Sequence, residues 1–306
     1  MEAFYPIIQL DPAWVKAEET MGTKGKFWVV LPDDKEPWLF KHTRESDGRY
    51  VGEHWAEKIA AEAADLLGVP HALVELAVFS GTPGSVSRRF TELSIPGTAL
   101  AHGNALLEGQ VIGYDRYKHH KQSDHTLANI LRVIDRMFVE EDDRELALAH
   151  MMGYLVLDAM ILNTDRHHQN WALIRYTTSS NELRGHRMAP TFDHASSLGR
   201  NVTPDQLKAW ALRPAQIDRY ARAAPGLIYA LSTDAKGLNP FELVKLALRV
   251  KPDHVRPWLH RLHTLDPGML EAIVYRVPPD VMSAEQQSFT AALLKHTLSV
   301  LQQLAP

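Results

Sequence analysis

The segment from Arg144 to Leu162 constrains the fold of this chain more than any other part of its sequence. Its leucine, methionine, valine and isoleucine residues do not keep to one side of a helix but occur nearly all round it. Such a helix has to be covered by other elements on every side. We therefore expect a helical lobe that is built around this segment.

The residues before this helix predict a smaller, β-rich lobe. Short runs of aromatic and β-branched residues predict strands at 27–30, 38–41, 74–78 and 85–90. Between the second and third runs, residues 52–67 are rich in alanine, glutamate and leucine and predict a helix. This helix is expected to end at Gly68, because glycine is a common helix C-cap.

From residue 97 onward the pattern changes to helical periodicity. A helix is expected at 126–139, before the apolar one at 144–162, and a hairpin of two strands at 171–176 and 187–192. Residues 204–305 are expected to form helices that prolines separate. The sequence thus predicts an α+β chain in which a β-rich lobe precedes a mostly helical lobe.

Composition excludes several classes of protein. Lys and Arg number 33 against 37 Asp and Glu, so the net charge of −4 does not favour direct nucleic-acid binding through bulk charge. Cysteine is absent, which excludes disulfides and thiolate zinc sites. No signal peptide and no apolar run of roughly 18 residues is present, so we expect a cytoplasmic protein without a membrane span.

The loop from Asn163 to Asn170 carries the main functional prediction. Asp165 and Asn170 are five residues apart, which is the Asp-to-Asn separation of a kinase catalytic loop. Phosphoryl transfer needs a carboxylate that accepts the proton of the attacking hydroxyl, and oxygen ligands that hold magnesium on the phosphates. Asp165 suits the first role and Asn170 the second. Asp193, after the predicted hairpin, is a second candidate ligand and is expected at a strand end.

A simpler interpretation exists for each of these residues taken alone. Asp and Asn in a loop commonly form turns by bonding to their own backbone, and Asp193 could merely end a strand. The order of a buried helix, Asp165, His167, Asn170, a hairpin and then Asp193 favours the functional interpretation.

The β-rich lobe should supply a cation for the nucleotide phosphates and an anion that holds this cation. Lys41, at the end of the strand predicted at 38–41, is the candidate cation. The anion should come from the helix at 52–67. Glu62 lies nearer than Glu57 to the bulky apolar face of that helix, so its periodicity leaves both glutamates open.

A candidate phosphate-binding loop precedes the first predicted strand. It consists of Gly22, Thr23, Lys24, Gly25 and Lys26. Glycines let backbone amides approach phosphates closely, although the same residues also suit a hairpin turn. The position of the loop before the Lys41 strand favours the nucleotide role.

The loop from Asn163 to Asn170 reads Asn-Thr-Asp-Arg-His-His-Gln-Asn. It resembles the N-x-D-x-H-x-x-N loop of HipA-like serine/threonine kinases, which is also similar to that of phosphatidylinositol 3/4-kinase-like proteins. The resemblance implies a two-lobed protein-kinase-like fold, with an N-lobe at 1–96 and a C-lobe at 97–306. It also implies ATP and Mg2+ as cofactors, Asp165 as the catalytic base, and Asn170 and Asp193 as metal ligands.

The resemblance extends from about Gly22 to Ser197. Residues 52–58 resemble one branch of the family, which implies Glu57 as the partner of Lys41. The strand at 85–90 resembles the one that leads into the hinge, which implies an adenine contact from Phe90 to Leu93. A protein substrate and an antitoxin-type regulator are further implications, although toxin–antitoxin members often carry an N-terminal subdomain that this chain lacks.

Three alternatives stay open. The first is a metal-dependent hydrolase that uses Asp115, His119, His120, Asp124 and His125. The second is a non-catalytic module that binds a nucleotide or a partner. The third is a small-molecule kinase of the aminoglycoside or choline type, which shares the two-lobed plan.

Overall fold

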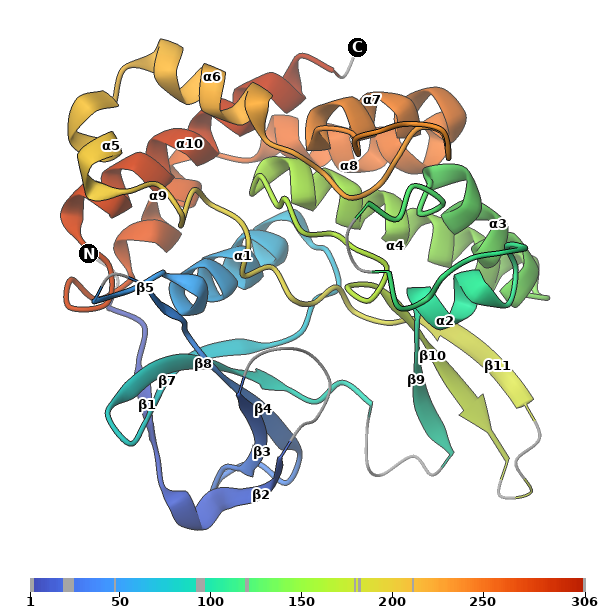
Figure 1. The fold of residues 1–306 in the computed structure, drawn as a ribbon, viewed down its shortest axis with the longest axis horizontal. Helices are drawn as coiled ribbons and strands as arrows, with labels where there is room; N and C mark the ends of the chain where they lie inside the picture. The colour runs from blue at the N-terminus through green and yellow to red at the C-terminus, as the bar shows by residue number, and fades with distance from the viewer. Residues whose placement is uncertain are drawn as a thin grey trace.

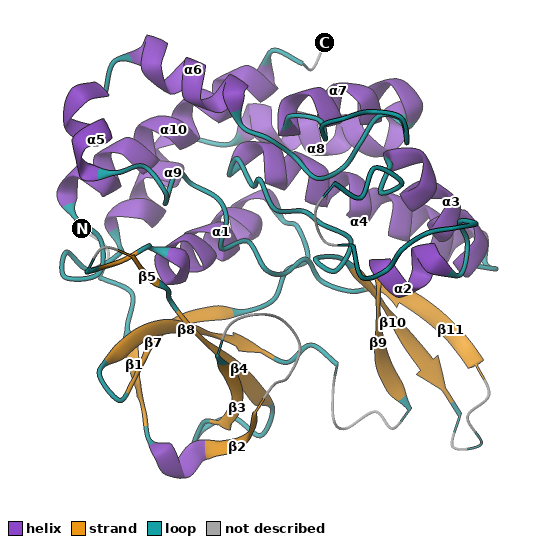
Figure 2. Ribbon diagram, viewed as in Figure 1, coloured by secondary structure: helices purple, strands orange, loops and turns teal. Residues whose placement is uncertain are grey.

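The computed structural model describes residues 3–18, 25–46, 48–91, 97–118, 121–178, 180, 183–210 and 212–304. A curled sheet occupies one end of the molecule, and the helices gather above it (Figures 1 and 2). The expected α+β architecture is confirmed. The predicted lobe boundary at 96 adjoins residues 92–96, which lie outside the described residues, and it stays a prediction.

The curled sheet has six strands in the order β1-β7-β8-β4-β3-β2. Their bounds are β1 Ile7–Leu10, β2 Val15–Glu18, β3 Lys26–Val30, β4 Pro37–His42, β7 Val74–Phe79 and β8 Thr82–Arg88. All neighbouring strands are antiparallel except β1 and β7, which run parallel. The four predicted strands exist, but β1 and β2 were not foreseen.

Strand β4 presents Lys41 on the side of the sheet away from its aromatic core. Phe40 is fully buried in a cluster with Val29, Trp38 and Val86. Since neighbouring residues of a strand point to opposite faces, Lys41 points away from Phe40. The core of the sheet thus fixes the direction in which Lys41 leaves the strand.

Helix α1 (Glu53–Leu67) lies between this sheet and the helices (Figure 1). It begins after Gly52 and ends at Gly68, which has a left-handed φ of 73° and donates its N–H to Ala64 and Asp65, as the C-cap prediction required. Helix α1 packs on β7 and β8 on one side and on α4, α8 and α9 on the other. Both sides of the helix are therefore covered, including the side that carries Glu57.

The N-terminal segment fastens α1 to the far helices. The N–H of Tyr5 donates to the carbonyl of Arg276 at 2.8 Å. The Arg276 guanidinium lies 4.4 Å from the centre of the Tyr5 ring, and the Nζ of Lys58 on α1 lies 4.8 Å from it. Arg276 also faces Glu62 of α1 at 3.7 Å.

Helix α4 (Glu141–Met160) is the centre of the helical region, as its sequence predicts. Every residue from Met151 to Met160 is buried. The surrounding helices are α2 Gly103–Glu108, α3 Leu127–Met137, α5 Pro204–Trp210, α6 Pro214–Ala223, α7 Pro240–Val250, α8 Pro252–Thr264, α9 Pro267–Tyr275 and α10 Ala284–Gln302. Helices α5 to α9 each begin with a proline, whose fixed φ and missing N–H suit the first helical turn. No helix in the described ranges is long and apolar enough to cross a membrane.

A three-stranded sheet projects beside α2 and α3, in the order β11-β10-β9 (Figure 2). Its strands are β9 Thr98–His102, β10 Ala172–Thr177 and β11 Leu183–Met188, and a separate pair is formed by β5 Glu45–Ser46 and β6 Arg49–Tyr50. The strand predicted at 187–192 is wrong in its bounds. It ends at Met188, just before Pro190, whose missing N–H cannot continue a ladder.

Candidate active site

The loop from Asn163 to Asn170, called the catalytic loop below, follows α4, and three of its hydrogen bonds meet at the backbone of Asp165. The backbone carbonyl of Asp165 accepts hydrogen bonds from the side-chain Nδ2 of Asn170 at 2.8 Å and from the N–H of His167 at 2.7 Å. The N–H of Asp165 donates to the side chain of Asn163 at 3.0 Å. Asp165 itself is half-buried, so the loop fixes its backbone while part of the residue stays exposed.

A buried ion pair supports this loop from below. Arg166 donates through Nε and Nη2 to the two oxygens of Asp158 on α4, both at 2.7 Å. The Nδ2 of Asn163 donates to the same carboxylate at 2.8 Å. Arg166 and Asp158 are 4% and 3% exposed. Burial acts to lower the pKa of Arg166, but the charge and hydrogen bonds of Asp158, together with the charges of Tyr154 and Asp193, outweigh burial and raise the pKa. Asp158 stands alone among apolar residues from Met151 to Met160, which is a sequence signal for this pair.

Arg166 also ties the loop to the segment that carries Asp193. Its Nη2 donates to the hydroxyl of Thr191 at 2.9 Å, and its Nη1 reaches the carbonyl of Phe192 at 3.4 Å. The structure thus brings Asp165, Asn170 and Asp193 into one region. Asp193 does not end a strand as expected, because β11 stops at Met188 and only an isolated bridge at Thr191 follows.

Asp193 meets Lys41 in an ion pair across the two halves of the molecule. The Nζ of Lys41 lies 3.0 Å from Oδ1 of Asp193. Burial acts to lower the pKa of Lys41, but the negative charges of Asp193 and Glu57 outweigh it and raise the pKa above its ordinary value. Lys41 therefore stays protonated. Asp193 has a left-handed φ of 61°, which is strained for a residue with a side chain, and such strain concentrates at functional sites.

Glu57, rather than Glu62, faces this ion pair. Its Oε1 accepts a hydrogen bond from the N–H of His194 at 3.0 Å, and its charge acts on Lys41. Glu62 instead pairs with Lys58 at 2.8 Å. The two-sided burial of α1 explains why the apolar face of the helix pointed to Glu62.

The imidazole ring of His194, next to Asp193, is neutral. Burial lowers its pKa well below 6.5, and the charge of Arg166 acts in the same direction. Its Nε2 lies 2.9 Å from the hydroxyl of Thr191. The segment after Asp193 is thereby held by Glu57 through its backbone and by Thr191 through the ring.

The residues proposed for the nucleotide are described in part. Phe90 stacks on Phe192 with ring centres 5.6 Å apart. The ring of His102 lies edge-on to Phe192, with ring centres 5.9 Å apart. Lys26 lies directly opposite Lys41 in the pairing of β3 with β4, so both emerge on the same face. Gly25 precedes this strand, whereas Gly22, Thr23, Lys24 and Leu93 lie outside the described residues.

The histidines of the hydrolase alternative do not form a metal site where they are described. The Nδ1 of His125 donates to the carbonyl of Leu227 at 2.9 Å, and its Nε2 accepts from the indole of Trp171 at 3.1 Å. Burial lowers the pKa of His125 to about 3. His119 and His120 lie outside the described residues, and within the described ranges no three His, Asp or Glu side chains are arranged to hold a metal.

A curled sheet, a buried linking helix and a helical region with this loop between them form a protein-kinase-like fold. Two solved structures have the same arrangement. The chain is similar to the Helicobacter pylori proinflammatory kinase CtkA, with a TM-score of 0.78, 16% identity and 98% of each chain covered. It is also similar to HipA of Shewanella oneidensis MR-1, solved as a toxin–antitoxin complex with HipB and operator DNA. There the TM-score is 0.53 and the identity 15%, over 98% of this chain and 67% of that chain.

Sequence comparison identifies the family. Residues 19–253 match the HipA-like C-terminal domain, and the chain belongs to that family. The match extends beyond the expected limit at Ser197 and includes α5, α6 and α7. No curated protein matches the chain by sequence.

Proposed function

We propose that this protein is an ATP- and Mg2+-dependent kinase that phosphorylates serine or threonine hydroxyls of a protein. The observation that carries the proposal is the 3.0 Å contact between Lys41 and Asp193. It joins a cation from the sheet to a carboxylate from a distant segment, next to the loop of Asp165. Phosphoryl transfer needs this convergence of a cation, a carboxylate ligand and a base.

The available side chains fit magnesium. The Nδ2 of Asn170 is engaged with Asp165, which leaves its Oδ1 as the oxygen able to bind a cation, and Asp193 offers a carboxylate. Magnesium takes one or two such protein oxygens and completes its shell with phosphate and water oxygens. When bound, Mg-ATP supplies the phosphoryl group and neutralises charge on the phosphates.

The remaining residues have separate tasks in this proposal. Asp165 accepts the proton of the attacking hydroxyl, for which its carboxylate on a fixed backbone is suited. Lys41 holds the nucleotide phosphates, and Glu57 steadies Asp193 through the N–H of His194. Phe90 contacts the adenine, and the loop from Gly22 to Lys26 covers the phosphates.

The cellular setting is also part of the proposal. The similar HipA structure was solved with HipB and operator DNA. We propose by analogy an antitoxin-type regulator for this chain, a protein acceptor, a cytoplasmic location, and no direct contact with nucleic acid or membrane. We keep the proposed division into lobes at 1–96 and 97–306.

Asp165→Asn tests the proposal most directly. The variant should fold and be stabilised by Mg-ATP like the wild type, while transfer of radiolabelled phosphate falls about a hundredfold to ten-thousandfold, since the base is lost. Asp280→Asn, at an exposed aspartate, is the matched control and should transfer phosphate normally. Unchanged transfer by Asp165→Asn, or a wild type that Mg-ATP does not stabilise, contradicts the proposal.

The acceptor can be found by comparing phosphopeptides from cells that express the wild type or Asp165→Asn. Phosphorylation sites that depend on Asp165 support a protein kinase. Label that appears only on small molecules favours the small-molecule alternative.

A further inference from the structure

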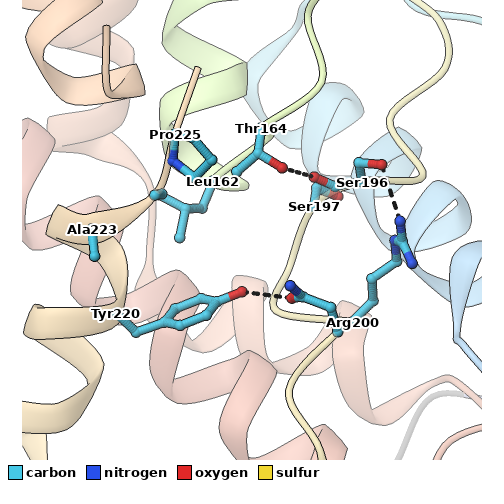
Figure 3. A pocket seen from close by; sticks show the side chains of 10 residues that line it. Leu162, Thr164, Ser196, Ser197, Arg200, Tyr220, Ala223 and Pro225 are labelled. Carbon is cyan, nitrogen blue, oxygen red and sulfur yellow. Dashed lines mark hydrogen bonds between the residues drawn. The ribbon is translucent and has the colours of Figure 1, made fainter. Parts of the chain in front are cut away.

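A pocket of about 240 Å3 lies between the catalytic loop and the C-terminal end of α6 (Figure 3). The catalytic loop contributes Thr164, the residue before Asp165, and the segment after Asp193 contributes Ser196 and Arg200. Apolar side chains of Leu162, Ala223, Ala224 and Pro225 form the rest of the wall, with Ser197, Asn201 and Tyr220. A pocket in this position adjoins the place where an acceptor hydroxyl has to lie.

The walls of this pocket are tied to each other. Thr164 donates through both its N–H and its hydroxyl to the carbonyl of Ser196, each at 3.1 Å. The hydroxyl of Tyr220 donates to the side chain of Asn201 at 2.8 Å. Leu162, where the loop begins, has a φ of 52°, a left-handed value that persists only where the surroundings impose it. The pocket is therefore a fixed part of the fold.

The charge in the pocket wall is incompletely neutralised. The side chain of Arg200 is 12% exposed, and its Nη2 donates to the hydroxyl of Ser196 at 3.1 Å (Figure 3). Its Nε is buried and makes no hydrogen bond within the described residues. Glu53 approaches Arg200 at 3.7 Å but already pairs with Arg44 at 2.8 Å, so two guanidinium groups share one carboxylate. Burial lowers the pKa of Arg200, and the negative charges of Glu53 and Asp165 offset this only in part.

Size and chemistry together define what the pocket can hold. Small-molecule sites usually measure about 300–1,000 Å3, so this pocket suits one side chain better than a nucleotide. Its apolar wall can cover methylene groups, while the partly exposed guanidinium of Arg200 can bind a carboxylate. Resting on the proposed kinase function, we infer that the pocket takes an Asp or Glu side chain that flanks the acceptor hydroxyl, with Arg200 as the specificity-determining residue.

Peptide pools test this inference. Each pool has one central serine and one neighbouring position fixed as Glu, Gln, Lys or Leu, and initial rates are measured with Mg-ATP. The wild type should prefer Glu over Gln at one position at least about tenfold, as expected for a charge-assisted hydrogen bond. Arg200→Glu should reverse the preference towards Lys, with the KM for ATP unchanged. Arg222→Ala, which removes an exposed arginine of α6, should keep the preference for Glu.

Each outcome decides the question. A wild type that binds Mg-ATP but phosphorylates no pool, or shows no preference for Glu, overturns the inference about the pocket. A preference for Glu that survives in Arg200→Glu also overturns it. If that variant does not fold, Arg200→Gln replaces it and should lose the preference. A wild type without any stabilisation by Mg-ATP instead refutes the proposed function, which separates the two failures.

Discussion

The loop from Asn163 to Asn170 and strand β4 hold their polar side chains in different ways. In the loop, Arg166 binds both oxygens of Asp158 at 2.7 Å, and Asn170 binds the backbone carbonyl of Asp165. The side chains of Arg166, Asp158 and Asn170 are almost fully buried. Lys41 on β4 is 18% exposed and meets a carboxylate that is itself a candidate magnesium ligand. The difference teaches that folding fixes the loop in advance, whereas the partner of Lys41 is one that the nucleotide of the proposed function would replace.

Arg166→Met tests how firmly the loop is held and should lower the stability of the protein more than any other change proposed here. The substitution leaves the buried carboxylate of Asp158 without its cation, which costs about 3–5 kcal/mol of unfolding free energy. Urea denaturation measures the loss. The double variant Asp158→Leu, Arg166→Met should recover part of it, because neither charge then stays buried alone. A loss below about 1 kcal/mol would show that the loop does not depend on this pair.

Acid should also lower the stability of the protein through buried histidines near the loop, but by a smaller amount. Burial lowers the folded-state pKa values of His125 and His194 from 6.5, to about 3 for His125. Below pH 6.5 the unfolded chain therefore binds more protons than the folded one, so stability falls as the pH falls. The two histidines together should cost about 2–3 kcal/mol at pH 5.5.

Urea denaturation between pH 7.5 and 5.5 checks this loss. His125→Gln should reduce the slope of stability against pH, since it removes one of the six described histidines whose pKa burial lowers. His263→Gln, at an exposed histidine, should leave the slope unchanged. A stability that does not change with pH contradicts the neutral burial of both rings.

Lys41→Met should have the smallest effect on stability and sharpen the contrast. The pair with Asp193 is partly exposed and screened, so its loss should cost below about 1 kcal/mol. Stabilisation by Mg-ATP and phosphate transfer should nevertheless both weaken, because the phosphates lose their cation. A destabilisation as large as that of Arg166→Met would show that β4 is as rigidly bound as the loop.

Local sequence patterns were enough to predict much of this molecule. The apolar run that became α4, the Gly68 cap and the five-residue spacing of Asp165 and Asn170 are all features of neighbouring residues. Such features depend on helix periodicity, glycine stereochemistry and loop length, which act within one segment. The requirements of phosphoryl transfer then linked Lys41 and Asp193 to the loop, and the family resemblance added Glu57 as the partner of Lys41.

Features that depend on distant segments were missed. The parallel pairing of β1 with β7 and the strand β9 depend on partners far along the chain, and their own sequences are short. The choice between Glu57 and Glu62 failed on periodicity because the C-terminal helices cover the second side of α1. The bidentate pair of Arg166 and Asp158 likewise requires knowing which way α4 and the loop face each other.

The fastening of α1 bears on how such an enzyme could be switched on and off. Tyr5 and Arg276 connect α1 to the C-terminal helices. At the C-terminal end of α1, the side chain of Arg261 lies 3.4 Å from the carbonyl of Gly68. A helix held by these contacts cannot move outward and withdraw Glu57 unless the contacts to the C-terminal helices break. We therefore expect a regulator of this protein to act on an element other than α1.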